Sequence, residues 1–142
     1  MPNAGITTDI IVGFPGETEE DFKKTYDFVK DIGFSRIHVF KYSPRKGTPA
    51  SKYENQVHGS IKSDRSERLI KLGEDLMEEF YSKYIGSTME VLFEENNDGY
   101  YEGYSTNYTR VKAYSDTDLV GQLVNVDILN FEKDHLVGRI GR

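Results

Sequence analysis

The first apolar run of the chain is followed by turn residues and then by a helical pattern. Residues 7–14 read TTDIIVGF, and the three branched residues at 10–12 stand together without polar alternation. Such a run is typical of a strand covered on both faces, as in a parallel sheet flanked by helices. Pro15 and Gly16 then indicate a tight turn. The pattern predicts a strand and a turn that leads directly into a helix.

The expected helix begins after Thr18 and ends at Gly33. Thr18 is a suitable N-cap, and Asp21 three residues later completes a variant of the capping box. Glycine just past the last turn is a common helix end. The apolar residues of this segment recur at helical spacing and predict one packed face: Phe22, Tyr26 and Val29, with Phe28 and Ile32 alongside.

A second strand is expected at about residues 36–42, and strand, helix, strand in this order predicts a parallel pair. A loop rich in Pro and Gly follows at 43–50, and residues 51–62 have no regular pattern. The longest helix is predicted for 64–84, with Ser63 as its cap and Gly86 just past its end. Its apolar stripe consists of Leu69, Leu72, Leu76, Phe80 and Tyr84.

The pattern changes to alternation after Gly86. Short strands are predicted around residues 89–93, 100–104, 108–114, 119–129 and 135–140. Turns are expected at 97–99, which reads NDG, and at 130–134. Five short antiparallel strands predict a small barrel related to the OB fold. The fold class is therefore α/β plus all-β. The β-α-β unit is expected at 1–62, the long connecting helix at 63–85 and the barrel domain at 86–142.

Composition narrows the function. The chain has no cysteine, which excludes disulfides, thiolate nucleophiles and cysteine-ligated clusters within it, and its three histidines lack metal-ligand spacing. There is no run of about 18 apolar residues and no signal-peptide pattern. Residues 1–84 include 13 basic and 14 acidic residues. Residues 85–142 include 5 basic and 10 acidic residues, so this second part has a net charge of −5. This charge argues against a strong, non-specific grip on phosphate backbones.

Specific motifs resemble one enzyme family. Residues 8–22, TDIIVGFPGETEEDF, resemble the fifth strand and following helix of the radical SAM methylthiotransferases. Residues 38–50, HVFKYSPRKGTPA, are similar to the sixth strand and its loop, and 103–111, GYSTNYTRV, resemble the TRAM domain that ends these enzymes. Within the family these motifs are most similar to those of the enzymes that act on threonylcarbamoyladenosine in tRNA.

The resemblance implies a carboxy-terminal fragment of a cytoplasmic radical SAM enzyme. The parent would use S-adenosylmethionine and two 4Fe–4S clusters, whose cysteines lie in earlier parts of the family's sequence. Because this chain has no cysteine, the fragment is expected to bind no cluster or cofactor and to be inactive alone. Its partner would be the anticodon stem-loop of tRNA. The apolar strands of an incomplete sheet also predict self-association.

Several residues are candidates for ligand contacts. In the parent, Ile11, Gly13, Phe40 and Tyr42 would line the S-adenosylmethionine pocket; the alternative is an ordinary tight turn between strand and helix. In the family motif Gly-x-Ile-x-Gly-x-x-Glu, Asp9 replaces the first glycine and Glu17 comes one residue late. The candidates for RNA contacts are Arg45, Lys46, Tyr104, Asn107, Tyr108 and Arg110.

Alternative functions stay open. Arg45 and Lys46 could contact tRNA phosphate or could be solvated charges of an ordinary loop. The barrel tyrosines could stack on bases or could pack in the core or on the strand surface. The chain could also be a stand-alone RNA-binding module. A third alternative is a methylthiotransferase that acts on isopentenyl-adenosine in tRNA or on ribosomal protein S12.

Overall fold

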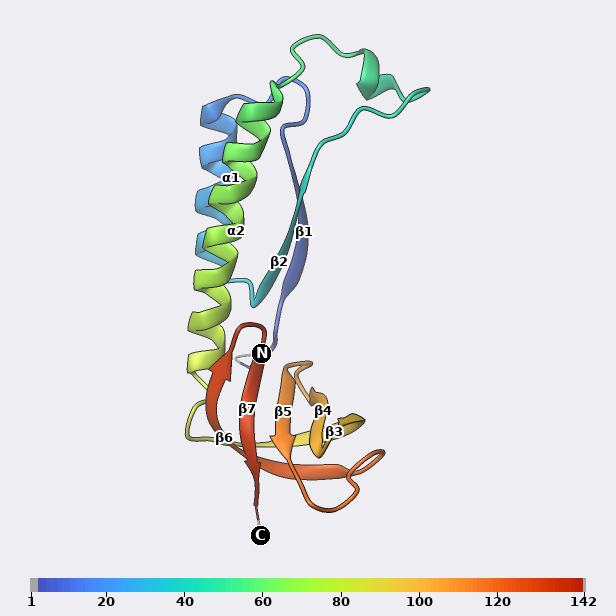
Figure 1. Ribbon diagram of the computed structural model, residues 1–142. Coiled ribbons are helices and arrows are strands. Elements are labelled where there is room, and N and C mark those ends of the chain that lie inside the picture. Colours follow the sequence, from blue (N-terminus) through green and yellow to red (C-terminus); the bar gives the residue numbers. More distant parts are fainter. Residues whose placement is uncertain (1–2, 142) are drawn as a thin grey trace. The chain divides into compact units, whose positions relative to one another are not determined.

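A computed structural model describes residues 3–141 and shows two units, one of which comprises residues 6–76 and the other residues 3–5 and 77–141. The first unit contains β1 (Thr7–Val12), α1 (Glu19–Ile32), β2 (Arg36–Lys41), a short 3-10 helix (Pro49–Lys52) and most of α2 (Gly59–Ser82) (Figure 1). The second unit contains the end of α2 and β3 (Thr88–Asn97), β4 (Tyr100–Ser105), β5 (Arg110–Tyr114), β6 (Leu123–Glu132) and β7 (His135–Ile140).

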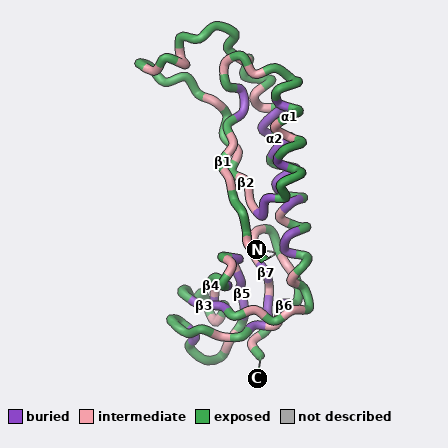
Figure 2. Tube along the Cα trace, turned by 180° about the vertical axis from the view of Figure 1, so that it is seen from behind, coloured by how far each residue is buried: buried purple, intermediate pink, exposed green. Residues whose placement is uncertain are grey.

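In the first unit, β1 and β2 form the predicted parallel pair, with Ile10 beside Val39 and Ile11 beside Phe40. One face of this sheet packs on the two helices: Val12 joins a buried cluster, and Ile10 and Val39 are partly buried against it. Figure 2 shows the purple buried positions of α1 and α2 in this unit. The helix residues of the cluster are Phe22, Val29, Leu69, Leu72 and Leu76.

The limits of α1 follow the sequence prediction. Thr18 caps the helix, its hydroxyl accepts from the N–H of Asp21 at 3.1 Å, and the Asp21 carboxylate returns the bond to the N–H of Thr18 at 3.0 Å. Gly33 ends the helix in the left-handed conformation. The packed face is narrower than predicted, because the side chains of Phe28 and Ile32 remain exposed.

The start of α2 was predicted wrongly. The helix begins at Gly59, so Ser63 lies inside it. His58 caps this start: its ring Nδ1 accepts from the N–H of Ser60 at 3.1 Å, and its carbonyl accepts from the N–H of Ile61 at 3.0 Å. Histidine is not among the preferred N-cap residues, which is why the pattern did not reveal the extra turn.

In the second unit the five strands close into a barrel in the order β3-β4-β5-β7-β6. The barrel was predicted, but one detail differs: β5 and β7 pair in parallel, whereas the other neighbours are antiparallel. The turn after β6 is also shorter than expected, because β6 continues to Glu132 and only Lys133 and Asp134 separate it from β7.

The barrel interior is a second core, separate from that of the first unit. Val91, Phe93, Val111, Val126 and Leu136 are completely buried in it. The end of α2 contributes Phe80 and Tyr81 to the same cluster. The apolar stripe of the long helix therefore serves two cores, as Leu69, Leu72 and Leu76 belong to the first. None of the helices in the described residues is long and apolar enough to cross a membrane.

Candidate functional site

A cavity of about 420 Å³ lies at the carboxyl ends of β1 and β2. Three of the four predicted cofactor residues line it: Ile11, Phe40 and Tyr42. Ile11 and Phe40 are register partners on the sheet face away from the helices, and their side chains are 59% and 53% exposed. The rest of the lining is Lys41, Ser43, Arg45, Thr48 and Ala50. The structure thus brings apolar surface and one guanidinium together at this sheet end.

Gly13, the fourth predicted cofactor residue, is buried but does not line this cavity. Its φ of +76° lies in the left-handed region, and a Cβ atom placed on it would lie 2.2 Å from Cγ of Lys62. The Lys62 ammonium donates to the carbonyl of Tyr42 at 3.0 Å. Packing within the unit is therefore sufficient to explain why this position is glycine.

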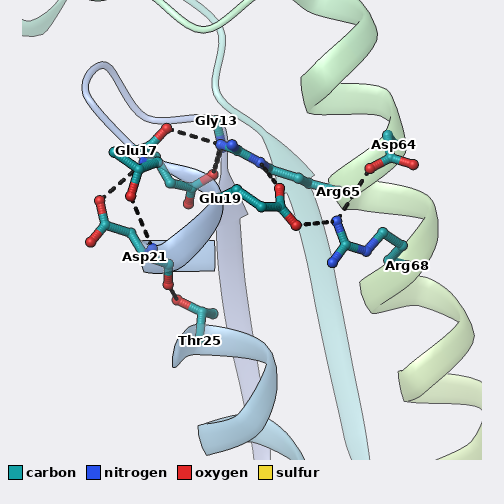
Figure 3. A network of polar contacts seen from close by, with 9 residues as sticks. Gly13, Glu17, Glu19, Asp21, Thr25, Asp64, Arg65 and Arg68 are labelled. Atoms are coloured by element: carbon teal, nitrogen blue, oxygen red, sulfur yellow. Dashed lines mark hydrogen bonds and ion pairs between the residues drawn. The ribbon is translucent and has the colours of Figure 1, made fainter. Parts of the chain in front are cut away.

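A buried ion pair holds the turn after β1 (Figure 3). The Glu17 carboxylate accepts from the N–H of Gly13 at 3.0 Å and from Nη1 of Arg65 at 2.7 Å. The side chains of Glu17 and Arg65 are only 13% and 5% exposed. Arg65 also donates to the Glu17 carbonyl at 3.0 Å. The helix α2 is in this way fixed to the strand end that borders the cavity.

Sequence reasoning did not identify Arg65, although one signal was present. Arg65 lies four residues before Leu69, on the apolar stripe of the helix. A charged residue at such a position needs a partner when it is buried. The partner is Glu17, the residue that comes one place late in the family motif.

The outer part of this polar network is exposed. Nη1 of Arg68 lies 2.7 Å from the Glu19 carboxylate, and this hydrogen bond lowers the pKa of Glu19. The backbone hydrogen bond from Thr18 lowers the pKa of Asp21 in the same way. These acids stabilise the start of α1, where negative charge is favourable.

Arg45 and Lys46, two of the predicted RNA contacts, lie exposed in the loop after β2. Arg45 lines the cavity, whereas Lys46 does not. Within residues 3–141 neither side chain takes part in an ion pair found in the structure. Both cations are therefore accessible for an anionic ligand.

The barrel divides its tyrosines between core and surface. Tyr101 is buried and packs edge-on against Phe93. Tyr104 and Tyr108 are 42% and 85% exposed, and their ring centroids lie 5.7 Å apart. A second exposed pair, 5.5 Å apart, is formed by Tyr100 and Tyr114. Of these five barrel tyrosines, only Tyr101 is in the core, and the other four are on the surface.

The remaining RNA candidates, Arg110 and Asn107, already have partners in the protein. Arg110 forms ion pairs with Glu102 and, at 3.3 Å, with Asp134. Its hydrogen bond to Glu102 raises the pKa of Arg110 and lowers that of Glu102. The amide of Asn107 donates to the hydroxyl of Tyr84 at 2.9 Å. An RNA ligand would therefore have to compete with these partners for Arg110 and Asn107.

Residues 3–141 contain no cluster of side chains that could hold a metal ion. The chain has no cysteine, and the described residues include no group of three or more His, Cys, Asp and Glu residues close enough to hold a metal ion. Ligands for an iron–sulfur cluster would have to come from other residues.

The sequence of this chain is similar to those of several tRNA-modifying enzymes. Over 134 residues (91% of this chain) the sequence is 42% identical to the threonylcarbamoyladenosine tRNA methylthiotransferase of Bacillus subtilis, of which it covers 30%. Over 140 residues (99% of this chain) it is 38% identical to the tRNA-2-methylthio-N(6)-dimethylallyladenosine synthase of Aquifex aeolicus, of which it covers 32%. The synthase of the same name from Acetivibrio thermocellus is 40% identical over 145 residues, covering 100% of this chain and 30% of that protein.

These matches show that the chain is homologous to tRNA methylthiotransferases over nearly all of its length, which confirms the resemblance of the motifs. The chain spans about a third of the length of these relatives. No protein-family model matches the chain.

Proposed function

We propose that the chain is the carboxy-terminal part of a tRNA methylthiotransferase that converts threonylcarbamoyladenosine beside the anticodon to its 2-methylthio form. The observation that carries this proposal is the 42% identity with the Bacillus subtilis enzyme of that name over 91% of the chain. The parent protein is a cytoplasmic radical SAM enzyme with two 4Fe–4S clusters and a TRAM domain.

In this proposal the first unit contributes one wall of the S-adenosylmethionine pocket. The fit is partial: Ile11 and Phe40 offer apolar faces suited to an adenine ring, and Arg45 offers a charge at the same cavity. Gly13 contributes through the turn that Glu17 and Arg65 hold. S-adenosylmethionine supplies the radical and the methyl group when it is bound, and this chain's residues orient it.

The second unit and the loop after β2 contact the tRNA. Arg45 and Lys46 suit phosphate oxygens because both are exposed cations after a strand end. On the barrel, Tyr104 and Tyr108 offer aromatic faces next to Arg110. We expect the chain alone to bind RNA weakly and to catalyse no methylthiolation, because it contains no cluster cysteines.

The test is deletion of the gene that encodes this chain, followed by mass spectrometry of the nucleosides from total tRNA. We expect 2-methylthio-threonylcarbamoyladenosine to disappear and to return when the gene is restored. The 2-methylthio derivative of dimethylallyladenosine serves as the internal control, because it should persist. An unchanged threonylcarbamoyl derivative contradicts the proposal.

A second substrate, dimethylallyladenosine, is favoured by a specific observation: two of the similar proteins described above are tRNA-2-methylthio-N(6)-dimethylallyladenosine synthases. The same mass spectra separate the two substrates. Loss of the dimethylallyl derivative alone would assign the chain to that reaction. If both tRNA nucleosides persist and ribosomal protein S12 loses its methylthio group, the substrate is the protein.

A further inference from the structure

The loop between β4 and β5 holds one tyrosine in an unusual backbone conformation. Tyr108 has a φ of +63°, in the left-handed region that bulky residues rarely occupy. Its side chain is 85% exposed, so burial of the ring does not compensate for this strain. Strained residues that the surrounding structure holds in place are characteristic of functional sites.

Hydrogen bonds within the loop fix the backbone around Tyr108. The N–H of Tyr108 donates to the carbonyl of Ser105 at 2.9 Å. The hydroxyl of Ser105 accepts from the N–H of Thr109 at 3.1 Å, and Ser105 and Thr109 also pair through their main chains at 2.9 Å. Both Ser105 and Thr109 are buried, which makes them firm attachment points.

Asn107 ties the same loop to other parts of its unit. Its amide nitrogen donates to the hydroxyl of Tyr84 and to the carbonyl of Asn3, both at 2.9 Å. Its amide oxygen accepts from the hydroxyl of Ser105. Because both ends of the carboxamide are engaged inside the protein, Asn107 suits a positioning role better than direct contact with a ligand.

The ring held in this way lies beside a second exposed ring. The planes of Tyr104 and Tyr108 are inclined by 41°, and their centroids are 5.7 Å apart. Aromatic faces fixed at a surface are suitable for stacking on unpaired bases, which is the usual mode of single-stranded RNA recognition. Because hydrogen bonds hold the backbone at Tyr108, the loop loses less conformational freedom when it binds.

The charges next to this ring pair cancel. Arg110 pairs with Glu102 and Asp134, and Lys112 pairs with Glu102 at 3.1 Å. Two basic and two acidic groups leave this cluster without net charge, within a segment whose net charge is −5 (5 basic and 10 acidic residues in 85–142). Phosphate neutralisation is therefore a small part of what this surface offers.

We propose that Tyr104 and Tyr108 form a stacking surface for an unpaired base of RNA, that Asn107 positions Tyr108, and that binding depends little on salt. This inference rests on the proposed function, because tRNA is the source of the unpaired base. It goes further by separating base stacking from phosphate contact on the barrel.

The experiment measures fluorescence anisotropy of a labelled anticodon stem-loop RNA with this chain at 50 and 200 mM salt. A protein that makes six to ten phosphate contacts loses about 10³–10⁵ in affinity over this range. We expect a loss of no more than about tenfold, the scale that two phosphate contacts, such as those proposed for Arg45 and Lys46, give over this range. A loss on the phosphate-contact scale would overturn the proposal.

Variants test the stacking. We expect Tyr108→Ala to weaken binding about fivefold or more, in line with the lower limit for one stacked base. Tyr108→Phe keeps the ring and should bind like the wild type. Tyr114→Ala is the matched control, because it removes a ring of the other exposed pair. Equal binding by Tyr108→Ala and the wild type would overturn the proposal.

A double-mutant cycle tests the positioning role. We expect Asn107→Ala to weaken binding in the wild-type background and to have no further effect in the Tyr108→Ala background. A purely structural role would lower the melting temperature and reduce affinity in both backgrounds. Additive effects of the two substitutions would overturn this role, and an unchanged melting temperature would then show that Asn107 contacts RNA independently.

Failure here can be told apart from failure of the proposed function. If the wild-type chain does not bind the stem-loop RNA, the stacking proposal is overturned. The same holds if the tyrosine surface binds a protein and no RNA. The nucleoside analysis of the deletion strain still decides the methylthiotransferase assignment, because it does not depend on the barrel surface.

Discussion

The two units of this chain manage their sheets in opposite ways. The barrel closes on itself, with β3 pairing to both β4 and β6, so its strands have partners on each side. The parallel pair of β1 and β2 has no further strand in the described residues, and Ile11 and Phe40 are exposed on its outer face. A closed sheet stabilises itself, whereas an open one depends on what covers it. The barrel sheet therefore leaves no strand edge open, whereas the parallel pair has edges and an apolar face that further structure could cover.

The largest expected effect comes from the barrel core. Phe93 is completely buried, and Phe93→Ala should destabilise the barrel by about 3–5 kcal/mol. Because Phe93 belongs to the cluster of the second unit only, the transition of the first unit should be affected less. Thermal unfolding followed by residue-resolved hydrogen exchange measures both. Equal loss of protection in both units would contradict the expectation that the two cores unfold independently.

The next effect concerns the ion pair of the first unit. Arg65→Leu leaves the largely buried Glu17 carboxylate with the N–H of Gly13 but without its cation, and should cost about 3–5 kcal/mol. Lys23→Ala is the control, since it removes an exposed helix pair and should change stability little. The check is urea denaturation of both variants. Similar midpoints for the two variants would show that the buried pair is not important for stability.

Self-association tests the open sheet directly. We expect the chain to form oligomers as concentration rises, because two exposed apolar side chains and unpaired strand edges invite pairing. Ile11→Ser combined with Phe40→Ser should shift the distribution toward monomer. The control is Leu123→Ser, on an exposed apolar residue of the closed barrel. Sedimentation velocity gives the answer, and a wild-type monomer at high concentration contradicts the expectation.

The smallest effect is a pH dependence of the barrel. The hydrogen bond from Arg110 lowers the pKa of Glu102, so Glu102 stabilises the folded state above its ordinary pKa of about 4.3. This contribution is lost as the pH falls through the lower folded value. Glu102→Gln should therefore lower stability at neutral pH and reduce its acid dependence. Denaturant midpoints at neutral and acidic pH measure this, with the exposed Glu94→Gln as the control.

Much of the fold was accessible from local sequence signals. The capping box of Thr18 and Asp21, the glycine after α1 and the NDG turn all act within a few residues, so a single sequence is enough to predict them. The start of α2 was missed because His58 caps it through an uncommon hydrogen bond. The parallel pairing of β5 and β7 joins residues 25 apart along the chain, such as Val111 and Leu136, which no local pattern specifies.

The candidate site shows the same division. The apolar pattern predicted the two strands, and the family resemblance indicated that Ile11, Phe40 and Tyr42 face a common ligand; the structure places all three on one cavity. The partners of Arg65 and Lys62 could not be inferred, because both side chains reach the strand ends from a helix far along the chain.

Short-range patterns and motifs were sufficient to predict the order of the main elements, the two-part organisation and the resemblance to methylthiotransferases. The folded structure was needed to show that Glu17 pairs with a buried arginine and that Asn107 is hydrogen-bonded within its own unit. It was also needed to show that Tyr108 has a left-handed backbone conformation and an exposed ring. The physical reason is that burial and hydrogen-bond partners depend on residues brought together from distant positions, and these decide what a polar or aromatic side chain can still bind.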